Sequence, residues 1–215
     1  MTTCLYGYWR SSAAYRVRIA LNLKGVVYDQ SPVHLVKDGG EQHSAEHKAR
    51  NPLSLVPALE IDGYTLIESP AILEYLEDTR PDPALMPSDP LGRAQVRAFA
   101  SHIACNIHPI GNLRVLQHLK TKGFDESEIK GWMQTWIAKG FIGLEALAQR
   151  QPNPEGWLFG DGPSLAEVYL VPQMYNARRW GVDLVAFPRL VAADQTAMIH
   201  DAFVRAAPED QPDAA

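Results

Sequence analysis

The first eighty residues alternate between patterns typical of strands and patterns typical of helices. Residues 5–9 form a short apolar run that predicts a strand, and residues 12–24 carry apolar side chains at helical spacing, with Gly25 as a stop signal. Residues 26–35 then have the pattern of extended chain, and residues 41–50 predict a weak polar helix. A strand, a helix and a second extended segment in this order predict a β-α-β crossover unit.

A hairpin and a further helix follow this unit. The runs 56–61 and 64–67 flank Asp62-Gly63, which is a strong signal for a tight hairpin turn. Ser69-Pro70 then predicts the start of another helix, with Ser69 as the cap and Pro70 in the first turn. The resulting order is β-α-β-α-β-β-α, a crossover unit followed by a hairpin and a covering helix.

A proline-rich segment separates this half from the rest of the chain. Four prolines fall within the eleven residues 80–90, which excludes both a helix and a central strand and predicts a linker. Beyond it, strand signals nearly vanish. Long helical patterns cover residues 92–120, 126–149, 164–180 and 189–206. The tail, residues 208–215, is expected to fray.

Charge and cysteine content limit the classes of partner. The formal net charge of -5 argues against nucleic acid and anionic membranes, since both require a basic face. Arg10, Arg16 and Arg18 interrupt the run that a signal peptide needs, and no stretch approaches the roughly 20 apolar residues of a membrane span. Cys4 and Cys105 have no C-x-x-C or metal-binding spacing. We therefore predict a reduced, cytoplasmic protein without a metal, and two buried, inert thiols.

The segment 8–20 carries the most chemical information. A strand ends there, Ser11 and Ser12 follow, and a helix begins. The N–H groups and dipole of a helix start favour an anion, and a thiolate is such an anion. A serine at this position can also simply cap the helix, and that interpretation stays open. Two serines flanked by Arg10 and Arg16 favour a site.

These residues resemble a known family. Ser11-Ser12 followed by residues 16–20 (RVRIA) is similar to the signature of the zeta-class glutathione transferases. The resemblance continues in Lys37–Gly40, Gln42, Asn51-Pro52, Val56-Pro57, Glu68–Ile72, Asn112, Val171–Gln173, Arg179 and Gln211–Asp213. It implies a thioredoxin-like glutathione-binding domain over residues 1–80, a linker over 81–90, and an all-helical domain over 91–215 that completes the substrate site.

The resemblance also implies roles for individual residues. Ser11 and Ser12 would face the glutathione sulfur, with Ala13 and Arg16 in the same segment. Family members usually carry cysteine where this chain has Ala13, and this departure argues against a redox role there. The other implied glutathione contacts are Gln42 at the glycyl end, Val56, Pro57, Glu68, Ser69, His108, Asn112, Leu113 and Arg114. Some family members place a glutamine near glutathione where this chain has His108.

Several of these residues also have a structural interpretation. A Val-Pro bond is usually trans, whereas the resemblance implies that Val56-Pro57 is cis, so that the polar backbone groups of Val56 can pair with glutathione like an added strand. Glu68-Ser69 can simply be a capped helix start with a neighbouring acidic residue. The N–H groups of such a start also suit a bound carboxylate, and the Glu68 carboxylate can hold an amino group. Arg178-Arg179 is typical of a solvated pair, while the resemblance marks Arg179 as a contact of a substrate carboxylate.

Two further motifs are assigned no catalytic role. Residues 164–167 (SLAE) predict a capping box at the start of an apolar helix. Residues 43–47 (HSAEH) match a zinc-protease pattern, but the segment is short and polar and no third ligand is apparent. We interpret it as a solvated helix face.

Together these features predict an activity. The resemblance implies a glutathione-dependent enzyme that converts maleylacetoacetate to its fumaryl isomer in aromatic and tyrosine catabolism. A thiolate that adds to the conjugated double bond makes it single and free to rotate, and glutathione supplies that thiolate. Arg10 and Arg179 are the cations expected to hold the substrate carboxylates. Maleylpyruvate as substrate, general conjugation of electrophiles, and a non-catalytic ligand-binding role stay open, and a homodimer is implied by resemblance only.

Overall fold

The computed structural model describes residues 2–151 and 156–214. The chain divides into two compact units. Residues 1–84 together with residues 200–215 form the first unit, and residues 85–199 form the second. The sequence predicted a helical domain that extends to residue 215, whereas the second unit ends at residue 199. The last sixteen residues group with the first unit.

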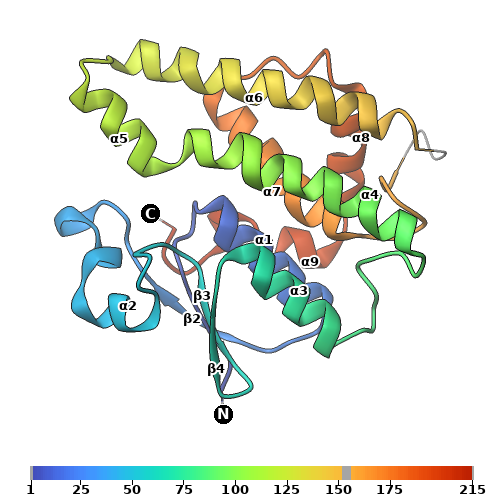
Figure 1. The fold of residues 1–215 in the computed structure, drawn as a ribbon, viewed down its shortest axis with the longest axis horizontal. Helices are drawn as coiled ribbons and strands as arrows, with labels where there is room; N and C mark the ends of the chain where they lie inside the picture. Colours follow the sequence, from blue (N-terminus) through green and yellow to red (C-terminus); the bar gives the residue numbers. More distant parts are fainter. Residues whose placement is uncertain (1, 152–155, 215) are drawn as a thin grey trace. The chain divides into compact units, whose positions relative to one another are not determined.

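The first unit is built on a four-stranded mixed sheet. Its elements are β1 (Cys4–Gly7), α1 (Ser12–Leu23), β2 (Asp29–Pro32), α2 (Ala45–Arg50), β3 (Ala58–Ile61), β4 (Tyr64–Ile67), α3 (Ser69–Thr79) and, from the C-terminal segment, α9 (Asp201–Val204). The strand order is β2-β1-β3-β4, with β1 parallel to β2 and β3 antiparallel to both of its neighbours. The order β-α-β-α-β-β-α is confirmed, and α1 and α3 lie on one side of the strands with α2 on the other (Figure 1).

The hairpin and the first helix follow the sequence pattern closely. Asp62 and Gly63 both have positive φ, 53° and 83°, which is the backbone that a tight hairpin turn requires. They bring Ile61 opposite Tyr64. In α1, Val17, Ala20 and Leu21 are fully buried, as their helical spacing predicts.

The described residues of the second unit form helices and the loops that connect them, without a strand. Its α-helices are α4 (Pro90–Ser101), α5 (Leu113–Thr121), α6 (Glu126–Ala148), α7 (Leu165–Trp180) and α8 (Pro188–Ala197). Helix α7 is the most buried of them, with an unbroken buried run from Leu165 to Met174. The predicted capping box is confirmed: Ser164 accepts from the backbone of α7, and the buried Glu167 carboxylate accepts from the Ser164 N–H at 2.9 Å. Burial raises the pKa of Glu167 above its usual range.

The helix predicted over residues 92–120 is interrupted. A π-helix (His102–Ile107) and a 3-10 helix (His108–Gly111) separate α4 from α5. The π-helix packs directly on α6, where a Cβ at Gly140 would lie 2.4 Å from the Ile107 side chain. Asn112 then caps α5. Sequence periodicity missed the break because apolar spacing continues across it, whereas the close contact with Gly140 is a tertiary feature.

The pattern over residues 189–206 is also divided. Helix α8 ends at Ala197, and α9 begins at Asp201 in the first unit. The start of α8 has no side-chain cap of its own, and the buried Glu145 of α6 accepts from the N–H groups of Arg189 and Leu190, each at 3.0 Å. A carboxylate from another helix therefore does what a local cap residue usually does.

Residues 208–214 of the tail do not fray, and residue 215 lies outside the described residues. Residues 208–210 form a 3-10 helix, and Pro208 and Gln211 are buried. The expectation of a loose end was wrong for these residues, because Gln211 bonds to Gln30 and Asp213 bonds to the Trp9 N–H, and such long-range bonds have no local sequence signal.

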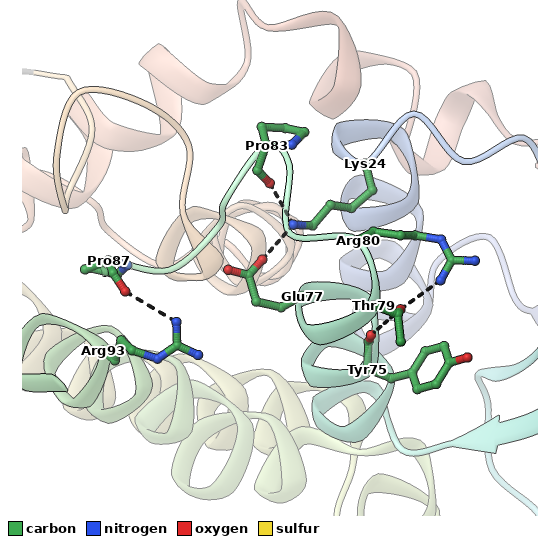
Figure 2. Close-up of polar contacts among 8 residues, drawn as sticks. All are labelled: Lys24, Tyr75, Glu77, Thr79, Arg80, Pro83, Pro87 and Arg93. Carbon is green, nitrogen blue, oxygen red and sulfur yellow. Dashed lines mark hydrogen bonds and ion pairs between the residues drawn. The ribbon is translucent and has the colours of Figure 1, made fainter. Parts of the chain in front are cut away.

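A buried ion pair joins α1 to α3. Lys24 Nζ lies 2.6 Å from Glu77 Oε2 and donates to the Pro83 carbonyl at 2.7 Å, so it also fixes the start of the linker (Figure 2). Figure 2 also shows the Thr79 hydroxyl donating to the Tyr75 carbonyl at 2.6 Å at the end of α3. The Lys24 side chain is fully buried and Glu77 is nearly so.

Replacing Lys24 by methionine should lower the free energy of unfolding by about 3–5 kcal/mol, because a buried carboxylate then loses its cation. Denaturant unfolding followed by circular dichroism measures the change. The variant Lys24→Met/Glu77→Leu is the matched control and should recover most of the loss, since no isolated charge remains. A double variant as unstable as the single one would contradict this assignment.

Among the described residues, no helix combines the length and apolar character of a membrane span.

Candidate functional site

The serine loop, residues 8–12, connects β1 to α1. Ser11 is the N-cap of α1: its Oγ accepts from the Ala14 N–H at 3.2 Å. The loop closes through the Ser11 N–H, which donates to the Tyr8 carbonyl at 2.9 Å. A hydroxyl has one proton and two lone pairs, so accepting the Ala14 bond leaves the Ser11 proton available for donation. The capping interpretation of Ser11 is correct. The hydrogen bond from the Ala14 N–H orients the Ser11 hydroxyl and still leaves its proton free to donate.

The first turn of α1 offers further donors. Ser12 is its first residue and Ala13 its second, and the first N–H groups of a helix have no intrahelical acceptor. With the helix dipole, they favour an anion at this point. The Arg10 guanidinium stacks over the Trp9 ring, 4.5 Å from its centroid, and donates to the Tyr8 hydroxyl at 3.3 Å. The serine loop thus combines a hydroxyl, N–H donors and a cation.

The start of α3 differs from the prediction. Glu68, not Ser69, is the N-cap, and it has a left-handed φ of 66°. Its carbonyl accepts from the Ile72 N–H at 3.0 Å. Ser69 is the first helical residue and is buried, because its hydroxyl turns inward to a partner from α1. A non-glycine residue held at positive φ is uncommon and is often found at a functional site.

Arg16 connects the two helix starts. Its guanidinium is buried, and Nη1 donates to Ser69 Oγ at 3.3 Å. By accepting this bond, the Ser69 hydroxyl keeps its own proton to donate. Arg16 therefore joins the first half of α1 to the start of α3.

The loop before β3 is fixed by side chains. The Val56–Pro57 bond is cis, as the resemblance implies. Buried Asn51 donates through Nδ2 to the Leu55 carbonyl at 2.9 Å and accepts from the Leu53 N–H at 3.0 Å. Val56 lies just before the paired residues of β3, beyond the sheet ladder.

The solvated face expected over residues 43–47 is confirmed for residues 43–46, which are exposed, and is wrong for His47. His47 is buried, and its Nε2 lies 2.8 Å from the Leu55 carbonyl. This histidine faces inward because it supports the loop that ends at Val56. In the ranges 2–151 and 156–214, no group of three His, Cys, Asp or Glu side chains is placed to hold a metal ion.

Gln42 lies in a 3-10 turn at the far end of the same unit. Its side chain is buried, with 8% exposure, and Nε2 donates to the Leu35 carbonyl at 3.2 Å. Gly40 permits this packing, since a Cβ there would lie 2.4 Å from the Gln42 amide. Gln42 Oε1 is buried without a hydrogen-bond partner among the described residues. Such an orphaned acceptor is unusual in a folded protein.

The cysteines are both free thiols. Burial raises the pKa of the Cys4 thiol, which disfavours its thiolate form. The prediction of two buried thiols was wrong for both, because Cys4 is partly exposed and Cys105, in the π-helix, is exposed. Neither thiol lies in the serine loop.

The remaining candidates belong to the second unit. Asn112 caps α5 through Oδ1, which accepts from the Arg114 N–H at 3.2 Å. Leu113 begins α5, Arg114 is exposed, and His108 begins the 3-10 helix just before them. The break between α4 and α5 thus gathers all four residues into one short segment.

Arg178 and Arg179 end α7 and have different environments. Both arginines are exposed, as expected for a solvated pair, and Arg178 also forms an ion pair with the buried Asp194 of α8. Burial raises the pKa of Asp194, and Arg178 opposes that shift. Arg179 is exposed, with its guanidinium 5.2 Å from the centroid of the Trp180 ring.

The structure also brings residues to the serine loop that the sequence did not assign to a site. Arg18 and Asp213 both bond to the backbone of Trp9. Arg18 had a detectable signal, since it is a charged residue on an otherwise apolar face of α1. Asp213 had none beyond its place in the Gln211–Asp213 motif.

Comparisons with known proteins agree with this geometry. The family described as glutathione S-transferase, N-terminal domain, matches residues 1–78. A maleylacetoacetate isomerase of Pseudomonas aeruginosa is 49% identical over 97% of this chain and 97% of its own length. A maleylpyruvate isomerase of a Ralstonia species is 51% identical over 98% of this chain and 99% of its own length.

Solved structures show the same similarity. The holo structure of a maleylpyruvate isomerase, described as a bacterial zeta-class glutathione transferase, matches with a TM-score of 0.95 and 50% identity, over 99% of this chain and 100% of that one. A maleylacetoacetate isomerase from Anaeromyxobacter dehalogenans, solved with glutathione in its active site, matches with a TM-score of 0.88 and 44% identity, over 100% of this chain and 98% of that one.

Proposed function

The chain belongs to the zeta class of the glutathione transferases, and from that premise we propose that it is a glutathione-dependent isomerase that converts maleylacetoacetate to its fumaryl isomer. The observation that carries the proposal is the serine-capped start of α1 joined through Arg16 to Ser69. The Ser11 and Ser69 hydroxyls are proton donors at the starts of α1 and α3, and the start of a helix favours an anionic group.

Glutathione fits the donors and acceptors of the first unit. Gln42 is the contact that the family resemblance implies for the glycyl end of the tripeptide. The Ser69 hydroxyl and the start of α3 suit its γ-glutamyl carboxylate, and the exposed Glu68 suits its amino group. Val56 offers backbone groups beyond the sheet ladder, which suits the extended backbone of the tripeptide.

When bound, glutathione supplies the thiolate that adds reversibly to the conjugated double bond of the substrate and so allows rotation about it. The protein stabilises the thiolate through the Ser11 hydroxyl and the N–H groups of Ser12 and Ala13. Arg10 and Arg179 hold the substrate carboxylates and offset the negative charge that develops on the substrate. No protein thiol takes part, which agrees with alanine at position 13.

The proposal is tested with purified protein and both maleyl acids. We expect isomerisation of maleylacetoacetate that requires glutathione, with a higher kcat/KM than conjugation of a general electrophile. Maleylpyruvate is the second candidate substrate, because a maleylpyruvate isomerase is equally similar in sequence. Conjugation without isomerisation of either acid would indicate a general transferase, and failure to bind immobilised glutathione would indicate a non-catalytic relative.

Ser69→Ala should weaken glutathione binding about tenfold or more without moving the pH midpoint of the rate. The lost bond is to a charged group, and such bonds contribute about 1.5–3 kcal/mol. Calorimetry gives the Kd, and initial rates at saturating glutathione give the pH profile. The exposed Ser127 provides a control, since Ser127→Ala removes a hydroxyl from another helix start and should leave the Kd unchanged. Equal affinities of wild type and Ser69→Ala would count against this role of Ser69.

We also propose that the protein acts in the cytoplasm and as a homodimer. Its two cysteines are free, and reduced glutathione is the major cytosolic thiol buffer. The dimer is suggested by the family alone, and light scattering of the purified protein tests it directly.

A further inference from the structure

The C-terminal segment, residues 200–214, packs within the first unit although it is farthest from it in sequence. Ala202, Phe203 and Ala206 are buried, and α9 packs against α1. Asn22 of α1 donates through Nδ2 to the Ala202 carbonyl at 2.9 Å. The segment is therefore a structural part of the unit that carries the serine loop.

Its last residues hold the backbone of the serine loop. The Trp9 N–H donates to Asp213 Oδ2 at 3.0 Å. The Trp9 carbonyl accepts from Arg18 Nη2 at 2.9 Å. Both polar backbone groups of Trp9 are thus fixed by side chains, two residues before Ser11, and the two peptide planes that flank Trp9 cannot rotate without breaking a charge-assisted bond.

Arg18 links this arrangement back to the tail. It is almost fully buried, and its Nε donates to the Ala206 carbonyl at 2.9 Å. One guanidinium therefore bonds to the serine loop and to the C-terminal segment at once. Its rigid fork of donors suits this double role, which a lysine would not fill.

Gln211 fixes the path of the tail toward Asp213. Its Nε2 donates to the Arg205 carbonyl at 3.0 Å and to the Ala207 carbonyl at 2.6 Å. Its Oε1 accepts from Gln30 Nε2 of the edge strand β2 at 2.9 Å. The buried Gln211 amide thus donates through Nε2 and accepts through Oε1. Pro212 restricts the backbone between Gln211 and Asp213.

We propose that the segment Gln211–Asp213 positions the serine loop for catalysis, with Asp213 acting through the Trp9 N–H and Gln211 acting by holding the tail. This inference rests on the proposed function, since it concerns the loop that stabilises the glutathione thiolate. Asp213 and Gln211 are positioning residues, because neither needs to contact glutathione or the substrate. Without Asp213, the loop gains freedom and the Ser11 hydroxyl is directed less well at the sulfur.

The test compares Asp213→Ala with Asp213→Asn, because asparagine keeps an oxygen that can accept from Trp9 and removes only the charge. The readouts are the pKa of the bound thiol, from thiolate absorbance, and the pH profile of kcat. Asp213→Ala should raise the thiol pKa by about half a unit to one unit and lower kcat at pH 7 by up to about tenfold, with recovery at high pH. Asp213→Asn should stay close to wild type.

A purely electrostatic role predicts the opposite sign. Removing a carboxylate near a thiolate lowers the thiol pKa, so both variants would then shift it downward. Asp210→Ala removes one charge from the same tail at an exposed position and should change neither readout. A purely structural role would lower the melting temperature of Asp213→Ala and leave its thiol pKa and pH profile unchanged, and that result would overturn the proposal.

The wild type separates this inference from the function on which it rests. A wild type that does not bind glutathione would overturn both. A wild type that binds and isomerises, together with a downward shift or no shift in Asp213→Ala, would overturn only the positioning role. Gln211→Ala should reproduce the direction of the Asp213→Ala effect, because it releases the same tail.

Discussion

A protein in which Ser11 and Ser12 are both replaced by alanine should bind glutathione with a thiol pKa about one unit or more above that of the wild-type complex. Its isomerisation rate at neutral pH should fall about tenfold or more, because a smaller fraction of the bound thiol is ionised. The loss should shrink as the pH rises and glutathione ionises without help. Thiolate absorbance of the bound thiol and rate profiles between neutral and alkaline pH measure the two effects.

The magnitude follows from the geometry of the cap. A hydrogen bond to a charged group contributes about 1.5–3 kcal/mol, and each pKa unit corresponds to 1.36 kcal/mol. The Ser11 hydroxyl accepts from Ala14 and can donate its own proton to sulfur. Ser12 stands at the first helical position and is partly exposed. Single variants distinguish the two, and we expect the larger shift from Ser11→Ala because its hydroxyl is already oriented.

Loss of a cap also costs about 0.5–2 kcal/mol of stability, and this must be separated from catalysis. Ser44 provides the matched control, since it caps α2 in the same unit by accepting from the His47 N–H at 3.1 Å. Ser44→Ala should destabilise the protein to a similar degree and leave the thiol pKa unchanged. An unshifted thiol in the wild type, or an unchanged profile in the double variant, would show that the thiolate is stabilised by other groups.

Arg179→Ala should lose about 100-fold or more in kcat/KM at every pH tested. Truncating one partner of a hydrogen-bonded charge pair costs about 2–5 kcal/mol, and the carboxylates of a maleyl diacid are ionised across the range in which the thiol titrates. The glutathione Kd and the pH midpoint should not move, because this side chain acts on the substrate and not on the thiol. The contrast with the serine variant is therefore in the shape of the pH profile.

Residues other than Arg179 hold the end of α7, so the Arg179→Ala substitution should not disturb the fold there. Its turn of α7 is held by Gln134, whose Nε2 donates to the carbonyls of Trp180 and Gly181 at 3.0 Å each. The neighbouring Arg178 is bound to Asp194, so truncating Arg179 leaves that anchor intact. Arg179→Lys keeps the charge without the bidentate fork and should retain part of the activity. Arg150→Ala, at an exposed arginine near the end of α6, should have wild-type kinetics. Activity of Arg179→Ala that returns at high pH would assign this residue to the thiol instead.

Local signals in the sequence predicted several elements of both units correctly. The hairpin at Asp62-Gly63, the helix that begins at the two serines and the Ser164 capping box each depend on a few neighbouring residues, and each is present in the structure. Such features are readable because the side chain and the backbone group that it serves are three or fewer residues apart. The family signature located the candidate site for the same reason, since the two serines, Val56-Pro57 and Glu68-Ser69 are short motifs.

The errors occurred where a tertiary partner overrode a local preference. Serine is a common N-cap residue, but the Ser69 hydroxyl turns inward to Arg16, and Glu68 is the N-cap of α3. The helix predicted through residues 102–112 is interrupted beside Gly140, which no window of neighbouring residues includes. His47 faces the interior because its partner is the Leu55 carbonyl.

The sequence by itself thus determined the order of strands and helices in the first unit and the helical character of the second, since these depend on periodicity, turn chemistry and short motifs. Only the tertiary structure decided how the site is supported. The bonds from Arg16 to Ser69 and from Asp213 to Trp9 join residues 53 and 204 positions apart. Contacts at such separations leave no periodic trace in the chain, because their geometry exists only after the intervening elements have packed.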